Sequence, residues 1–179
     1  MSISLFTALA AAGEARELSQ VLACNERSEE FGLFLTPEEA KQLVAAKNES
    51  LAKCQRAEFG SGVLNKLIEA FCDSDFIEQD EYLNILSELQ DIFYLFKNES
   101  VDELSDDELI AFMREQFETV CFGDLDYLAD TCLERFSRAV RAGYRGFRSS
   151  GGHGEYENLA QEKRWDKDLY MEVLRELFW

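Results

Sequence analysis

The stretch YLNILSELQDIFYLF, residues 82–96, decides the fold. Its apolar side chains recur every three or four residues, which is the period of an α-helix. Leu83, Tyr94 and Leu95 widen the apolar stripe beyond one face of that helix. Because a helix that is apolar on several sides needs neighbours on several sides, residues 82–96 are predicted to form the centre of a bundle.

The segments around this helix carry helix-start signals of their own. In Thr36-Pro37-Glu38-Glu39, Thr36 can cap a helix, Pro37 can take its first position and Glu39 can complete a capping box, which predicts a helix from 37 to about 56. Ser105-Asp106-Asp107-Glu108 is a second such box, and further helices are predicted over 64–71 and from Asp124 onward. No segment shows sustained period-two alternation, so the predicted fold is all-α, an irregular bundle of about six helices.

The first residues are predicted to form a helix that contributes to the core. Ile3 to Ala12 is apolar, but no Lys or Arg precedes Arg16, so the positive region of a signal peptide is missing. The five cysteines are an odd number without a Cys-x-x-Cys pair, which favours a reducing compartment. We therefore expect a cytoplasmic protein, and the absence of a long apolar run predicts no membrane association.

The charge of the chain is strongly negative and unevenly distributed. The sequence of 179 residues has 36 acidic and 18 basic side chains, for a net charge of −18. Because such a surface repels phosphate, nucleic acid is an unlikely partner. Residues 1–134 hold 29 acids and 9 bases, whereas residues 135–179 hold 7 acids and 9 bases. The two parts of the chain therefore have opposite polarity.

Five arginines form a stripe where the polarity changes. They are spaced three, three, four and three residues apart and fall on one side of a helix: Arg135, Arg138, Arg141, Arg145 and Arg148. The stripe could neutralise the acidic body of the same molecule, contact an acidic partner protein or another copy of the chain, or touch phosphate or RNA. The first two interpretations are favoured over the third because the surrounding field is negative.

The C-terminal part is predicted to be organised separately. Residues 1–148 are assigned to the helical bundle domain and residues 149–164 to a flexible loop that includes Ser-Ser-Gly-Gly-His-Gly. Residues 165–179 form a predicted amphipathic helix, docked on the bundle or exchanged between two copies. Its apolar side is a candidate partner-binding surface that includes Trp165, Leu169 and Leu177.

The usual catalytic and cofactor motifs do not occur in the sequence. His153, the single histidine, lies between two glycines in the predicted loop, where it is poorly placed to serve a nucleophile or an iron site. Neither a Walker-type nor a dinucleotide-binding glycine motif occurs. The run Asp73-Ser74-Asp75 starts like a calcium loop, but Ile77, Glu78 and Asn84 occupy positions that need other residues. No catalytic residue, metal ligand or cofactor is therefore predicted.

Several short stretches resemble a bacterial protein family of unknown function. They include Asn48-Glu49-Ser50-Leu51, Glu58-Phe59-Gly60-Ser61-Gly62, Ala70-Phe71-Cys72-Asp73-Ser74, Phe96-Lys97-Asn98-Glu99-Ser100 and Ser105-Asp106-Asp107-Glu108-Leu109. The similarity covers roughly residues 15 to 145. It implies a cytoplasmic bacterial protein and assigns no activity to any residue.

Three hypotheses about function follow from these observations. The first is a non-enzymatic protein-interaction module that recognises an unknown partner, or itself, through its acidic face, the arginine stripe or the C-terminal helix. The second is a metal-dependent or hydrolytic enzyme whose carboxylates come together from distant helices. The third is an acidic decoy of nucleic acid, which would need carboxylates in two rows at phosphate-like spacing.

Overall fold

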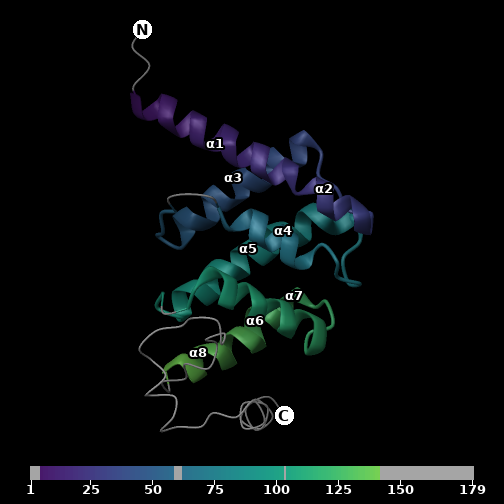
Figure 1. The fold of residues 1–179 in the computed structure, drawn as a ribbon. Coiled ribbons are helices and arrows are strands. Elements are labelled where there is room, and N and C mark those ends of the chain that lie inside the picture. Colours follow the sequence, from purple (N-terminus) through teal and green to yellow (C-terminus); the bar gives the residue numbers. More distant parts are fainter. Residues whose placement is uncertain (1–4, 59–61, 103, 142–179) are drawn as a thin grey trace, which may run out of the picture.

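The computed structural model describes residues 5–58, 62–102 and 104–141 (Figure 1). Within these residues it has six helices of 9 residues or more and no strand, which confirms the all-α bundle. The long helices are α1 (Leu5–Ala23), α3 (Pro37–Lys53), α4 (Val63–Phe71), α5 (Tyr82–Glu99), α6 (Asp106–Thr119) and α8 (Leu133–Arg141). The short elements are α2 (Asn25–Ser28), η1 (Glu29–Phe31), η2 (Gln79–Glu81), α7 (Leu125–Tyr127) and the π-helical turn η3 (Leu128–Cys132).

The predicted helix starts are confirmed together with their caps. The Thr36 side chain accepts a hydrogen bond from the Glu39 N–H, and the Glu39 carboxylate accepts one from the Thr36 N–H at 2.8 Å. Ser105 and Glu108 form the same reciprocal box at the start of α6. These caps satisfy main-chain donors that a helix leaves unpaired at its first turn.

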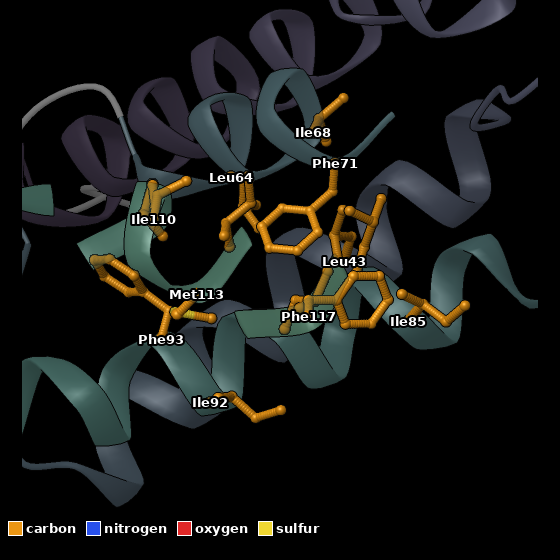
Figure 2. Packing of buried hydrophobic residues seen from close by; sticks show 14 of the residues in the cluster. Leu43, Leu64, Ile68, Phe71, Ile85, Ile92, Phe93, Ile110, Met113 and Phe117 are labelled. Atoms are coloured by element: carbon orange, nitrogen blue, oxygen red, sulfur yellow. The ribbon is translucent and has the colours of Figure 1, made fainter. Parts of the chain in front are cut away.

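Helix α5 lies at the centre of the described bundle, as predicted. It contacts α3, α4, α6 and α8, and Leu89 and Phe96 are completely buried. Figure 2 shows side chains of α4, α5 and α6 that converge in this core. The rings of Phe71 on α4 and Phe117 on α6 meet edge to face, with their centroids 5.5 Å apart. Such pairs stabilise a core beyond the apolar area that they bury.

A cluster of three phenylalanines holds α8 against the bundle. Phe136 on α8 lies 4.9 Å from Phe96 on α5 and 5.3 Å from Phe112 on α6, measured between ring centroids. Phe96 and Phe112 are themselves 5.8 Å apart. Because the three rings come from three helices, their packing fixes the side of α8 that faces solvent.

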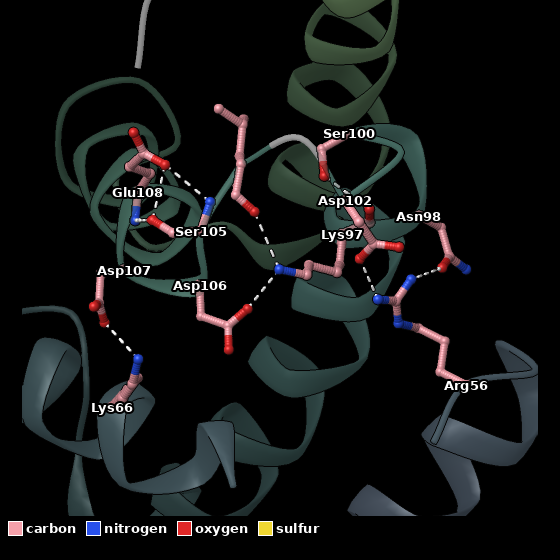
Figure 3. Close-up of polar contacts among 11 residues, drawn as sticks. Arg56, Lys66, Lys97, Asn98, Ser100, Asp102, Ser105, Asp106, Asp107 and Glu108 are labelled. Carbon is pink, nitrogen blue, oxygen red and sulfur yellow. Dashed lines mark hydrogen bonds and ion pairs between the residues drawn. The ribbon is translucent and has the colours of Figure 1, made fainter. Parts of the chain in front are cut away.

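Ion pairs fasten the start of α6 to its neighbours (Figure 3). The Nζ of Lys97 on α5 lies 2.6 Å from the Oδ1 of Asp106, and the Nζ of Lys66 on α4 lies 2.8 Å from the Oδ1 of Asp107. Asp106 and Asp107 are in the first turn of α6, where negative charge is favourable because of the helix dipole. The two carboxylates therefore stabilise both the helix and its docking.

Two side-chain amides hold the segment between η1 and α3. The Asn25 amide donates to the Leu35 carbonyl at 2.8 Å and accepts from the Leu35 N–H at 2.9 Å. At the preceding residue, the Gln79 amide accepts a hydrogen bond from the Phe34 N–H and donates one to the Phe34 carbonyl. Neighbouring residues that present their N–H and C=O groups to opposite sides are typical of an extended chain. We call this arrangement the double amide clamp.

The first helix contributes to the core through its second half, and the segment from Asp124 onward differs from the sequence-based expectation. In α1, Val21 is fully buried and Leu18 and Leu22 pack against the core, which confirms that the first helix contributes to it, whereas residues 10–16 are exposed. Ala10, Ala11 and Ala12 are too small to require a partner element. The segment from Asp124 onward, predicted as one helix, is interrupted by η3, because a π-helical turn adds a residue to the i→i−4 ladder.

Candidate functional site

The three described arginines of the stripe do not face the same environment. Arg138 pairs with Glu134 one turn earlier, and Arg141 pairs with Glu99 of α5 at 3.1 Å. Both arginine side chains remain largely exposed, at 67% and 74%. Arg135 is half-buried, and its positive charge lowers the pKa of the Cys132 thiol. The stripe thus has an outer part, Arg138 and Arg141, and an inner residue, Arg135.

The outer arginines border an open pocket of about 580 Å³. Ser137 donates a hydrogen bond to Glu99, the same carboxylate that holds Arg141. The lining mixes carboxylates, guanidinium groups and hydroxyls, so it fits a charged or zwitterionic group better than an apolar one. It is formed by Glu99, Ala129, Asp130, Thr131, Leu133, Glu134, Ser137, Arg138 and Arg141.

The other predicted partner-binding residues lie outside the described part of the chain. They are Arg145 and Arg148 of the stripe and Trp165, Leu169 and Leu177 of the C-terminal segment. The predicted loop 149–164 and the predicted helix 165–179 lie outside it as well.

A second surface was not predicted from the sequence and consists of exposed aromatic side chains. Large apolar side chains are usually buried, so a group of exposed ones indicates an interaction site. The residues come from the connections 29–36, 73–81 and 122–127, near α2 and α7 on the right of Figure 1. We call this surface the aromatic end. Its members are Phe31, Phe34, Phe76, Phe122 and Tyr127.

Two contacts join the three connections that carry the aromatic end. Gln79 joins 73–81 to 29–36 through its hydrogen bonds to Phe34. Phe76 joins 73–81 to 122–127, since its ring lies 6.5 Å from that of Phe122. A Cβ on Gly123 would come within 2.7 Å of the Phe76 Cβ, so only glycine allows this approach.

The aromatic end is surrounded by negative charge. The connections 29–36, 73–81 and 122–127 contain nine Asp or Glu residues and no Lys, Arg or His. The crowding is visible at Glu88 on α5, whose pKa is raised above its ordinary value by burial and then by repulsion from Asp126 and Asp91. Arg114 of α6 pairs with Asp73 at 3.1 Å and Arg27 lies near Glu30, so the surface combines apolar contact area with an excess of acidic side chains.

Phe122 occupies a backbone conformation that favours glycine. Its φ is 49° and its side chain is 68% exposed. The left-handed region costs a residue with a Cβ about 1–2 kcal/mol. The folding of the core does not require a phenylalanine at an exposed position, and strain of this kind is concentrated at functional sites.

The sequence did contain a signal for the aromatic end. Phe34, Phe76 and Phe122 lie between helices rather than within an apolar helical stripe, and each is close to acidic residues. Periodicity assigns helical aromatics to a core and says nothing about aromatics in connections. Their juxtaposition depends on contacts between residues that are more than 40 positions apart, such as Phe34 and Gln79.

Two further properties of the described residues bear on function. They include no group of three or more His, Cys, Asp and Glu residues placed to hold a metal ion. None of the helices in this part of the chain has the length and apolarity needed to span a membrane.

Comparison with known proteins places the chain in a family. No curated protein and no solved structure matches it. A family model matches residues 20–146, which is close to the range over which the sequence resembles a family of unknown function. The matched range includes the double amide clamp, the aromatic end and α8. The chain therefore belongs to the family of unknown function DUF6323.

Proposed function

We propose that this chain is a protein-interaction module whose aromatic end receives a basic segment of another protein. The observation that carries the proposal is the combination of five exposed aromatic side chains with nine acidic residues and no basic residue in the same three connections. Aromatic anchors supply most of the energy of many protein interfaces. The acidic surroundings select a partner in which Lys or Arg side chains flank apolar ones.

The main chain beneath the aromatic end supports this role. Gln79 restrains Phe34, and Gly123 lets Phe76 pack closely against the turn that presents Phe122. Side chains on a restrained backbone lose little entropy when a partner binds, so each contact contributes more to affinity.

We propose the outer arginines of α8 as a second contact surface. Arg138 and Arg141 are exposed and pair with Glu134 and Glu99, respectively. An exposed ion pair of this kind contributes about 0–1 kcal/mol, so a carboxylate of a partner can replace the internal one at little cost. We also place the module in the bacterial cytoplasm, where its five free thiols stay reduced.

Site-specific photocrosslinking tests the proposal. Benzoyl-phenylalanine is placed at position 122 in the cells that produce the protein, and adducts are identified by mass spectrometry. The matched control is position 95, because Leu95 is an exposed apolar residue on α5 outside the aromatic end. The expected result is an adduct with a basic segment of one protein from position 122 and not from position 95.

A variant with neutralised carboxylates measures how much the acidic residues contribute to binding of the partner. Asp75→Asn, Asp80→Asn and Asp126→Asn together remove three exposed carboxylates, whereas Asp124 is kept because it caps α7. The adduct should weaken strongly in this variant. Each of four results would overturn the proposal. They are the absence of an adduct at position 122, equal labelling from positions 122 and 95, an adduct with a second copy of this chain, and an adduct that neutralisation leaves unaffected.

A further inference from the structure

Two buried cysteines lie in contact next to the aromatic end. The Sγ atoms of Cys121 and Cys132 are 3.6 Å apart, and Cys132 is completely buried. Cys121 follows α6 and precedes the strained residue Phe122, whereas Cys132 is the last residue of the π-helical turn η3. A disulfide bond is ~2.05 Å long, so the sulfurs must approach by roughly 1.5 Å to bond.

The surroundings of the two thiols differ, since the Cys132 Sγ also lies 3.9 Å from the Gln116 Oε1. A hydrogen bond from the Cys121 thiol lowers the pKa of Cys132 and the positive charge of Arg135 also lowers it, whereas burial of the sulfur opposes both effects. The same hydrogen bond raises the pKa of Cys121, and burial adds to this effect. Cys132 is therefore the more acidic thiol of the pair, which makes it the better nucleophile of the two.

We propose that Cys121 and Cys132 are an oxidation site that closes to an intramolecular disulfide when hydrogen peroxide reaches it. This inference goes beyond the interaction function, because it assigns a chemical modification to residues that do not face the proposed partner.

The reaction proceeds in two balanced steps. The Cys132 thiolate attacks one oxygen of the peroxide, so an S–O bond forms, the O–O bond breaks and hydroxide leaves, to be protonated to water. The Cys121 sulfur then attacks the Cys132 sulfur, so the S–S bond forms and the S–O bond breaks. The departing hydroxide takes up the Cys121 proton. Overall, two thiols and one hydrogen peroxide give one disulfide and two waters.

The turn beside Cys121 provides the access that the buried pair needs. It is held by main-chain hydrogen bonds from Cys121 to Gln116 at 2.8 Å and from Gly123 to Phe117 at 3.0 Å. Phe122 and Gly123 are both in the left-handed region. A short turn under strain, at the end of a helix and next to an exposed side chain, opens at lower cost than the helices around it.

Peptide mapping after oxidation tests the inference. The reduced protein is exposed to hydrogen peroxide under native conditions, its remaining thiols are alkylated and it is digested with trypsin. Cleavage after Arg114 and Arg135 gives one peptide, residues 115–135, that contains both cysteines. The expected result is that this peptide loses two hydrogens and both of its alkylatable thiols, and that dithiothreitol reverses both changes.

The variants Cys121→Ser and Cys132→Ser should each abolish the disulfide, whereas Cys54→Ser, which changes a half-exposed thiol, should leave it unchanged. In Cys121→Ser, dimedone should trap a sulfenic acid at Cys132. The peptide map of the oxidised wild-type protein shows whether the disulfide forms, even if a variant fails to fold. Two results would overturn the inference. One is that both thiols of peptide 115–135 can still be alkylated after Cys54 has been oxidised. The other is a disulfide yield that is the same in urea as in the native protein.

Discussion

Gln79 binds both main-chain groups of Phe34, with its Oε1 2.9 Å from the Phe34 nitrogen and its Nε2 3.0 Å from the Phe34 oxygen. The two residues are 45 positions apart, so this single side chain connects two loops that no helix joins. Without it, the exposed ring of Phe34 would depend only on its neighbours in sequence for its position.

The first prediction concerns this side chain. Gln79→Ala should lower the free energy of unfolding. Each of the two lost hydrogen bonds contributes at most about 0.5–1.5 kcal/mol, because water can partly replace them at an exposed site. Urea unfolding measures the change. Gln42→Ala, at an exposed glutamine of α3, is the control and should stay within about 0.5 kcal/mol of the wild type. Equal effects at the two positions would show that Gln79 does not hold the loop.

The second prediction concerns the coupling between the two amides. Asn25→Ala and Gln79→Ala remove hydrogen bonds to the neighbouring residues Leu35 and Phe34. Because both amides restrain the same short segment, the loss in the double variant should differ from the sum of the single losses by about 0.5 kcal/mol or more. A double-mutant cycle from unfolding curves measures this term, and simple additivity would contradict the clamp.

The third prediction separates stability from binding at Phe122. Asparagine tolerates the left-handed region better than phenylalanine, so Phe122→Asn should regain part of the cost of about 1–2 kcal/mol. The lost ring contact with Phe76 offsets about 0.5–1.5 kcal/mol of this gain. Thermal unfolding should therefore change little, whereas the photocrosslink from a second position of the aromatic end, Phe34, should be lost. A large loss of stability would mean that Phe122 is structural.

The fourth prediction concerns pH and Glu58, whose Oε2 lies 3.9 Å from the Nζ of the buried Lys47 on α3. Burial raises the pKa of Glu58 above 4.5, against the opposing effects of Tyr94 and Lys47. Between 4.5 and its raised pKa, the folded chain holds a proton that the unfolded chain has released, so stability should fall as the pH rises through this window. Glu58→Gln has no such proton to release.

Urea unfolding between pH 4.5 and 7 measures the slope of stability against pH. Glu58→Gln should flatten this slope, and adding Glu88→Gln should flatten it further, since the pKa of Glu88 is also raised by burial. A slope that Glu58→Gln leaves unchanged would contradict the assignment.

The sequence was sufficient to predict those parts of the fold that depend on local signals. The boxes Thr36–Glu39 and Ser105–Glu108 lie within four residues each, and the apolar spacing of 82–96 lies within one helix, so these predictions are confirmed. The matched family was also indicated by the sequence.

The remaining features depend on contacts between distant segments. Whether Arg135 points inward and Arg141 outward depends on the packing of Phe136 against Phe96 and Phe112. The contact between Cys121 and Cys132 depends on the turn after α6 and on η3, whose extra residue shifts the register of the following helix. Neither periodicity nor spacing reports such three-dimensional neighbours.

The double amide clamp has a consequence for how the protein behaves at high concentration. An extended segment with free N–H and C=O groups can recruit a strand from another molecule and start aggregation. In residues 34 and 35 these groups already bond to Gln79 on one side and Asn25 on the other. The loop can therefore display an aromatic ring to a partner without offering its backbone as a template for β-pairing.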